Sequence, residues 1–437
     1  MARRSPFPNV TVLDVYDRDN DGELLARPVK WDSDEPPPPI YLAPERGKRF
    51  AGPAIGIGDR VLARINRQKD GSFEARVMKR IGASVHKILG VVREDGRGTR
   101  VHPVDRRSKH DLLIAKDELN GAKEGELVLA ELLPTRGYGP KMGRIVERLC
   151  DVNEPSAVSL IAIHAHNIPM DFPSAVETAA KKARPASVGN RTDLRDIPFI
   201  TIDPRDARDH DDAVHAERDK DPNNKGGFIV RVAIADVAHY IHTGEPLDVE
   251  ALRRGVSAYF PDRVVPMLPE RISNNLCSLR EKEDRPCLAV EMVFDTSGRK
   301  KKHSFMRGIM RSAAKLSYEE AQNAADGNPT ARAEPYTDSV IKPLYEAYAA
   351  LATARDARGP LDLDLPERKI ELNKDGKVQS INVRIRLKAH RLIEECMIQA
   401  NVCAAETLEK AKLPLIYRVH ETPSEEKLTS LRDFLKT

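Results

Sequence analysis

A segment of this chain occurs twice, and the repeat is the feature that most restricts its fold. Residues 58–64 read GDRVLAR, and residues 125–131 read GELVLAE. Further along, residues 75–81 read ARVMKRI, and residues 143–149 read GRIVERL. The partners lie 67 and 68 residues apart, so both the order and the spacing of the segments are kept.

The repeated unit is the size of a small β-barrel. Short runs of alternating apolar and polar residues, separated by turn residues, are typical of strands. Five-stranded barrels of the oligonucleotide-binding type fit a unit of about 70 residues. We therefore expect two tandem barrels, at residues 9–83 and 84–150. Aromatic residues, on which such barrels stack bases, are only 5% of the chain, so the repeat indicates architecture better than RNA binding.

The rest of the chain predicts a larger α/β domain. Residues 151–190 are expected to be a helical linker, and residues 191–437 a separate domain. Apolar runs predict strands at 197–202 and 227–235. A period of 3.6 residues predicts a helix over 389–412.

Composition excludes several classes of protein. The chain has 437 residues, of which 40% are hydrophobic and 32% charged, and it has no apolar run long enough to span a membrane. We expect neither a membrane segment nor a secretion signal. The five cysteines form no CxxC pair, which argues against a disulfide framework or a structural zinc site and favours a cytoplasmic location. A net charge of +4 does not by itself indicate a nucleic-acid partner.

An acidic segment follows the first strand of the α/β domain. Residues 201–212 read TIDPRDARDHDD and contain five aspartates: Asp203, Asp206, Asp209, Asp211 and Asp212. Like charges at close range repel unless a counter-charge is present. A hydrated surface loop with ion pairs would hold them apart, whereas a hard cation such as Mg²⁺ would hold them together around a phosphate substrate. Arg205 and Arg208 could form ion pairs with carboxylates that bind no metal ion, or they could contact phosphate.

At this segment the chain resembles the RNB family of exoribonucleases, which includes ribonuclease II and ribonuclease R, and the likeness is stronger to the ribonuclease R members. The family pattern corresponds here to TID at 201–203 and DARDHDDA at 206–213. The likeness extends over roughly residues 80–437 and agrees with two cold-shock barrels ahead of the catalytic domain. Its other motifs are AIADV at 233–237, YFP at 259–261, VPMLP at 265–269, SNNLCSL at 273–279 and LIEECM at 392–397.

The resemblance implies a processive 3′→5′ exoribonuclease. Such an enzyme requires Mg²⁺, acts on single-stranded and structured RNA, and releases nucleoside 5′-monophosphates. We expect a cytoplasmic monomer. Two alternatives stay open: an RNA-binding protein whose RNB domain is a non-catalytic scaffold, and an Mg²⁺-dependent hydrolase acting on another substrate. Retention of all four aspartates of the motif favours the nuclease, and the tandem barrels disfavour the other hydrolase.

The resemblance also implies roles for individual residues. Metal ligation is expected from Asp203, Asp209, Asp211 and Asp212, foremost from Asp203 and Asp212. Asp211, together with Asp209, is expected to act in catalysis at the 3′-terminal nucleotide, and Asp206 to orient the motif.

A second set of residues is expected to contact RNA. Its members are aromatic or apolar residues near the bases, a basic strand face over 381–388, and two acids on the following helix: Tyr259, Leu363, Arg384, Arg386, Lys388, Glu394 and Glu395. The alternatives are a core position for Tyr259, a merely solvated strand face, and capping or ion pairing by the two glutamates.

Two residues depart from the family pattern. His210 stands where phenylalanine is common, and we expect it to alter only local packing. Leu363 stands where a second stacking aromatic is usual, which would weaken the clamp on the terminal bases.

Compared with the family, the chain is expected to be truncated at both ends. The helical domain that commonly precedes the barrels, the second half of the catalytic domain and an S1 domain are not found in it. A last helix at 424–436 would carry Leu428, Leu431 and Leu435 on an uncovered face. The sequence leaves open whether the chain is a natural product, a frameshift or a fragment.

We therefore predict that the chain by itself binds RNA weakly, through residues 9–149, and has little or no Mg²⁺-dependent exonuclease activity. The physical reason is that loss of even one transition-state donor costs about 10²–10³ in rate. Incubation with 5′-labelled single-stranded RNA and Mg²⁺ measures this. A ladder of products running to short ends, abolished by Asp211→Asn, would show the prediction to be wrong.

Overall fold

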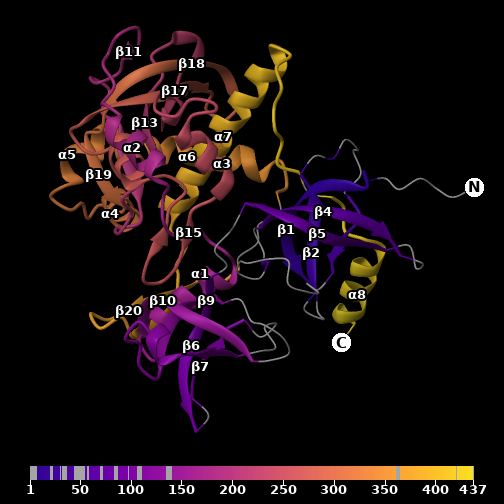
Figure 1. Cartoon of the computed structure of the whole chain (residues 1–437). Helices are drawn as coiled ribbons and strands as arrows, with labels where there is room; N and C mark the ends of the chain where they lie inside the picture. Colours follow the sequence, from indigo (N-terminus) through magenta and orange to yellow (C-terminus); the bar gives the residue numbers. More distant parts are fainter. Residues whose placement is uncertain are drawn as a thin grey trace, which may run out of the picture. The chain divides into compact units, whose positions relative to one another are not determined.

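The chain forms two compact units (Figure 1). Its computed structural model describes residues 7–19, 23–29, 31, 37–43, 55–56, 59–68, 72–82, 87–96, 98–105, 111–133, 140–360, 365–419 and 421–436. The first unit comprises Met1–Asp171 with Ala258–Val265 and Ile370–Ile381. The second comprises Phe172–Ser257, Pro266–Lys369 and Asn382–Thr437.

Two closed five-stranded barrels form most of the first unit. The strands of one barrel pair in the order β1-β2-β3-β5-β4, and those of the other in the order β10-β8-β7-β6-β9. The pairings are the same in both, including one parallel pair, β3 with β5 and β8 with β10. The strands are β1 Val10–Arg18, β2 Leu24–Pro28, β3 Ile40–Leu42, β4 Arg60–Arg67, β5 Phe73–Gly82, β6 Lys87–Asp95, β7 Gly98–Pro103, β8 Leu112–Ile114, β9 Glu126–Leu132 and β10 Lys141–Asp151.

The sequence repeat falls on corresponding strands of the two barrels. The first repeated segment lies on β4 and β9, and the second on β5 and β10. In β4, alternate residues Val61, Ala63 and Ile65 point into the barrel core, as the period of a strand requires. The expected tandem barrels are therefore confirmed.

Two hairpins from the later part of the chain also belong to the first unit. One joins β15 (Ala258–Tyr259) to β16 (Val264–Val265), and the other joins β20 (Arg368–Leu372) to β21 (Val378–Val383). The helix after the second barrel, α1 (Ser156–Ala165), lies in the same unit, and Gly376 of the second hairpin packs against Pro155 just before it. Both hairpins lie within residues 191–437 of the sequence.

A seven-stranded mixed sheet forms the centre of the second unit, in the order β11-β18-β17-β14-β13-β12-β19. Its strands are β11 Thr192–Asp193, β12 Ile200–Asp203, β13 Asp212–Arg218, β14 Phe228–Ala235, β17 Asp284–Phe294, β18 Lys300–Arg311 and β19 Ala314–Ser317. Its helices are α2 Ser174–Lys182, α3 Pro246–Arg254, α4 Tyr318–Ala325, α5 Glu334–Tyr336, α6 Lys342–Asp356, α7 Lys388–Lys410 and α8 Glu425–Leu435. This is the expected α/β catalytic-type domain.

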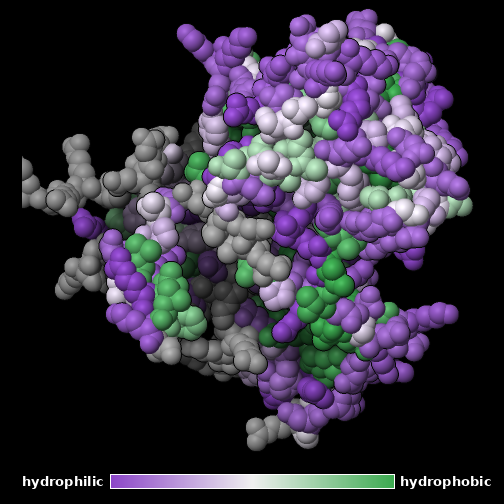
Figure 2. All heavy atoms as spheres, turned by 180° about the vertical axis from the view of Figure 1, so that it is seen from behind, coloured by the Kyte–Doolittle hydropathy of each residue, from purple (hydrophilic) through white to green (hydrophobic). Residues whose placement is uncertain are grey.

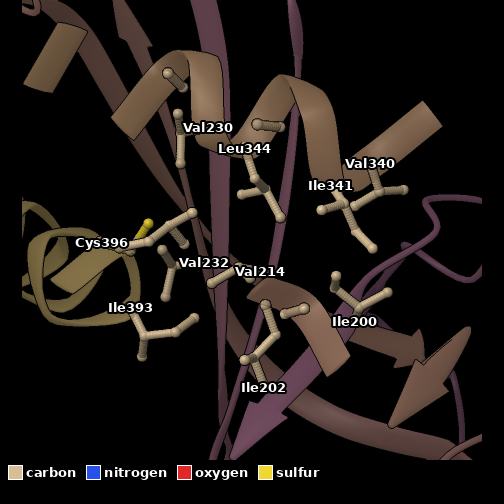
Figure 3. Close-up of a cluster of buried hydrophobic side chains, with 14 of the residues drawn as sticks. Ile200, Ile202, Val214, Val230, Val232, Val340, Ile341, Leu344, Ile393 and Cys396 are labelled. Carbon is tan, nitrogen blue, oxygen red and sulfur yellow. The ribbon is translucent and has the colours of Figure 1, made fainter. Parts of the chain in front are cut away.

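Each face of this sheet is covered by its own core. Along β14, Val230 and Val232 point into one core, and Ala233 and Ala235 into the other. In the first core, Leu344 of α6 and residues of α7 meet the strands (Figure 3). Because both faces are buried, these strands read as nearly continuous apolar runs.

The strand expected over 381–388 is wrong in its second half. The strand β21 ends at Val383, residues 384–387 form no strand, and Lys388 begins α7. Ile381 and Ile385 are 60% and 77% exposed, so the alternating pattern has no buried face to support a longer strand.

The surface is mainly hydrophilic, in keeping with a chain that is 32% charged. In the face shown in Figure 2, apolar side chains gather only in smaller patches. The helix α8 buries none of its residues, and its Phe434 and Leu435 are 74% and 73% exposed. Across the described part of the chain, no helix combines the length and apolar character needed to cross a bilayer.

We predict that Gly298→Ala destabilises the second unit strongly. Gly298 has φ +77°, and a Cβ there would lie 2.2 Å from the backbone oxygen of Ala350 in α6. The control is Gly244→Ala, at φ +83° with open space around it. The expected loss in free energy of unfolding is about 2–5 kcal/mol for Gly298→Ala and about 1–2 kcal/mol for the control. Equal losses in calorimetric unfolding would contradict the close packing on α6.

Candidate active site

The acidic segment connects two neighbouring strands of the sheet. Asp203 is the last residue of β12, and Asp212 is the first residue of β13. The strands are antiparallel neighbours, with Ile200 opposite Val214, so their adjacent ends bring the two aspartates to one place. Both strands are fixed by apolar side chains in the core beneath (Figure 3).

The carboxylates of this segment interact with one another. Burial, and after it the charges of Asp209 and Asp203, raise the pKa of Asp211 to about 6. Burial also raises the pKa of Asp212 to about 7, again with contributions from Asp203 and Asp211. Asp211 lies at the solvent-facing edge, whereas Asp212 lies deeper, and its Oδ2 atom is buried without a hydrogen-bond partner. This arrangement favours a shared site over a hydrated loop.

His210 does more than alter local packing, which corrects our expectation. Its Nδ1 atom lies 2.7 Å from Oδ2 of Asp203, and the two side chains are only 5% and 14% exposed. An imidazole can hydrogen-bond a carboxylate, which a phenylalanine at this position cannot do. His210 thus contacts one of the expected metal ligands directly.

The segment 273–279 forms hydrogen bonds with the backbone of the acidic loop. The backbone N–H of His210 donates to Ser278 Oγ at 3.2 Å, and Ser278 Oγ donates to the carbonyl of Arg208 at 3.0 Å. The N–H of Leu279 donates to the carbonyl of His210 at 2.8 Å. Since Ser278 is fully buried, these bonds fix the backbone on which the aspartates sit.

Tyr318 is a site residue that the sequence reasoning missed. The parallel pairing of β12 with β19 places Ser317 opposite Asp203, and Tyr318 follows as the first residue of α4. Burial, and then the charges of Asp203 and Asp212, raise the pKa of Tyr318 to about 12, which places its hydroxyl near the cluster. Its ring stacks on His390 of α7 at 4.0 Å. The available signal was the helix-starting pattern Ser317-x-x-Glu320.

The two glutamates of α7 lie in different surroundings. Glu395 is fully buried and accepts a hydrogen bond from Gln399 at 2.8 Å, and Arg358 lies 3.6 Å away. Glu394 forms an ion pair with Arg386. The ion-pairing alternative therefore describes the contacts of both side chains, and their contact with RNA stays a prediction.

The predicted basic residues are exposed at the start of α7. Arg384 lies 3.3 Å from Glu367. Burial, and after it the charge of Arg384, lowers the pKa of His390. Lys388 is the first residue of α7.

The remaining predicted residues lie on the hairpin β15–β16, in the acidic loop, or outside the described part of the chain. Tyr259 belongs to the first unit, on the hairpin β15–β16, where it is 66% exposed, so it is not a core tyrosine. Leu363 lies outside the described residues. Arg205, Asp206 and Arg208 are exposed in the acidic loop.

The donor set consists of carboxylate oxygens. Among the residues that the structure describes, no three histidine, cysteine, aspartate or glutamate side chains form a complete ligand group for a metal ion. Among the described residues, the Oδ2 atom of Asp212 is a buried carboxylate oxygen without a hydrogen-bond partner.

Comparison with known families agrees with this geometry. Residues 191–437 match the RNB domain, and residues 101–173 match a cold shock domain. The chain belongs to the RNB family. Among characterised members, it is 40% identical to ribonuclease R of Vibrio parahaemolyticus over 388 residues, which are 86% of this chain and 46% of that protein. The chain thus spans about half the length of the curated relatives it matches.

Solved structures of an RNB protein are also similar. Mycoplasma genitalium RNase R in complex with ribose-methylated single-stranded RNA aligns with a TM-score of 0.74 and 25% identity, over 98% of this chain and 66% of that one. The same enzyme in complex with double-stranded RNA aligns with a TM-score of 0.72 and 26% identity, over 82% and 64%. The order of cold-shock barrels followed by an RNB domain, expected from the sequence, is confirmed.

We predict that Asp212→Asn stabilises the second unit at pH 8 in the absence of divalent cations. A carboxyl whose pKa is raised from 3.8 to about 7 destabilises the fold once it ionises, so stability falls as pH rises through that window. Removing the charge should raise the free energy of unfolding by about 1–3 kcal/mol at pH 8, and the gain should shrink toward pH 4. Calorimetry in EDTA measures both, with exposed Asp206→Asn as the control. Destabilisation at both pH values would refute the account.

Proposed function

We propose that the chain carries the hydrolytic site of a 3′→5′ exoribonuclease that degrades RNA processively to nucleoside 5′-monophosphates. The observation that carries the proposal is the clustering of Asp203, Asp211 and Asp212 at the adjoining ends of β12 and β13 within an RNB domain. Like charges held this close together and partly out of water are costly unless a ligand compensates them.

A divalent cation such as Mg²⁺ fits this donor set. Hard cations prefer carboxylate oxygens, and Oδ2 of Asp212 lacks a hydrogen-bond partner. Mg²⁺ often keeps several waters and binds one or two carboxylates plus substrate phosphate, so a group of three protein ligands is not required. Asp203 and Asp212 would hold the ion, with Asp209 and Asp211 beside them. When bound, the ion would neutralise these charges and polarise the phosphoryl group.

The reaction transfers the 3′-terminal nucleotidyl group to water. The water oxygen bonds to phosphorus, the bond from phosphorus to the 3′-oxygen of the preceding nucleotide breaks, and that oxygen receives a proton. The products are a nucleoside 5′-monophosphate and an RNA shortened by one nucleotide with a free 3′-hydroxyl. Asp211, at the solvent-facing edge of the cluster, is placed to orient the attacking water at the 3′-terminal nucleotide.

The substrate of this site is single-stranded RNA, with structured RNA also bound. Mycoplasma genitalium RNase R, solved with RNA of both kinds, supports this assignment. Tyr259, which is 66% exposed, suits stacking on a base. Exposed Arg384, Arg386 and Lys388 suit contacts with phosphate, although Arg384 and Arg386 also lie near Glu367 and Glu394.

The protein is proposed to act as a monomer in the cytoplasm. Its five cysteines are free thiols, as a reducing compartment would keep them. The second candidate function is an RNA-binding protein with a non-catalytic RNB scaffold. Ion pairing of Glu394 and Glu395 agrees with either function, whereas the clustered aspartates favour the nuclease.

We predict that Asp211→Asn, placed in a version of the chain extended to the length of its ribonuclease R relatives, lowers the rate of RNA shortening by about 10²- to 10⁴-fold and leaves RNA affinity unchanged, because binding depends mainly on phosphate contacts. Single-turnover assays with excess protein, 5′-labelled RNA and Mg²⁺ detect even slow cleavage. Asp206→Asn is the matched control, since it removes one charge from the same loop at an exposed position.

Three outcomes would count against the proposal. Products ending in a 3′-phosphate would exclude the proposed bond cleavage. Equal rates for Asp211→Asn and the parent chain would exclude the role of Asp211. RNA binding without any cleavage by the extended version would favour the non-catalytic scaffold.

A further inference from the structure

The hairpin β15–β16 is too short to be stable without support. Only two residue pairs form it, Ala258 with Val265 and Tyr259 with Val264, and the N–H of Phe260 closes its turn on the carbonyl of Arg263 at 2.8 Å. An isolated two-stranded hairpin is marginally stable at best. Tyr259 and Val264 are directly opposite and share one face, where they are 66% and 48% exposed. The exposed tyrosine therefore depends on whatever holds the hairpin.

The neighbouring helix α1 is fixed to the second barrel. Ala157 and Leu160 of α1 are 1% and 6% exposed, and they share a core with Leu89 of β6 and Leu127 of β9. Burial of this kind makes the helix move with the barrel.

A part-buried hydrogen bond connects that helix to the hairpin, which lies beside it (Figure 1). Ser159 Oγ of α1 donates to Oδ1 of Asp262 in the hairpin turn. Ser159 is 6% exposed, and the side chain of Asp262 is 18% exposed. The other oxygen, Oδ2, accepts from Nε of Arg263 at 2.9 Å. Although burial opposes it, hydrogen bonds from Ser159 and Arg263 lower the pKa of Asp262, so the bond from Ser159 is charge-assisted.

We propose that Ser159 and Asp262 are positioning residues that hold the hairpin of Tyr259 on the second barrel. The base-stacking face of Tyr259 is then set by the cold-shock part of the chain, not by the sheet that carries the aspartates. This inference rests on the proposed function, because it takes the partner of Tyr259 to be a base of single-stranded RNA.

The anchor itself is testable without RNA. Ser159→Ala should speed amide hydrogen exchange in residues 256–267 by about tenfold, since a lost charge-assisted bond lowers the local opening free energy. Ser156→Ala is the matched control on the same helix, because Ser156 lies near Glu154 and not in the hairpin. Unchanged exchange in Ser159→Ala would overturn the proposal.

The positioning role is tested by a double-mutant cycle on RNA affinity, measured in EDTA so that no turnover occurs. Tyr259→Ala should weaken binding of a single-stranded oligomer by about 5- to 100-fold. Ser159→Ala should weaken it by about 3- to 10-fold in the parent but not in the Tyr259→Ala background. Asp262→Asn, which keeps Oδ1 as an acceptor, should cost less than Asp262→Ala.

The outcomes separate the inference from the proposed function. Equal effects of Ser159→Ala with and without Tyr259 would show that the bond supports only the fold, which would overturn the positioning role. A parent chain that binds no RNA would refute the proposed function and with it the role of Tyr259, while hydrogen exchange would still decide whether Ser159 anchors the hairpin.

Discussion

Repulsion between buried carboxylates at the ends of β12 and β13 is the constraint on which the second unit depends. Burial, with the charges of Asp203 and Asp211, raises the pKa of Asp212 to about 7, so ionisation of this carboxyl near neutral pH destabilises the fold. The fold withstands this because Ile200 and Val214 are fully buried in one core, while Phe199 and Ala213 are fully buried in the other. A strand covered on both faces cannot move aside to relieve the repulsion.

The loop between these strands adds a second restraint. Ser278 accepts from the N–H of His210 and donates to the carbonyl of Arg208, so one buried hydroxyl fixes the backbone on both sides of Asp209. Loops normally gain freedom because their backbone groups face water. Here the buried hydroxyl of Ser278 satisfies two of these backbone groups instead, which fixes the backbone that carries the aspartates.

Much of this could be predicted from local patterns, and what failed depends on distant partners. The repeat around Val61 and Leu127 predicted two barrels because strand periodicity is a local property. The strand expected through Arg386 failed because no second layer covers Ile385, which is 77% exposed. The contact of His210 with Asp203 and the position of Tyr318 depend on pairing between strands, which residue types alone do not reveal. The hairpin that carries Tyr259 is hydrogen-bonded through Asp262 to Ser159, which lies 103 residues before Asp262 in the sequence.

The two innermost carboxylates are not equivalent, and their difference suits them to bind a cation. Asp203 is oriented by His210, which occupies its Oδ2 atom at 2.7 Å. Asp212 has no such partner for its own Oδ2 atom, which is buried and unsatisfied. A buried acceptor without a donor is costly, and a cation relieves that cost more completely than water does. If the Oδ2 atoms of both carboxylates were hydrogen-bonded, hydrogen bonds within the protein would account for the position of both side chains. Here one oriented oxygen lies beside one unsatisfied oxygen, so the two carboxylates have different surroundings, which agrees with the proposed cation site.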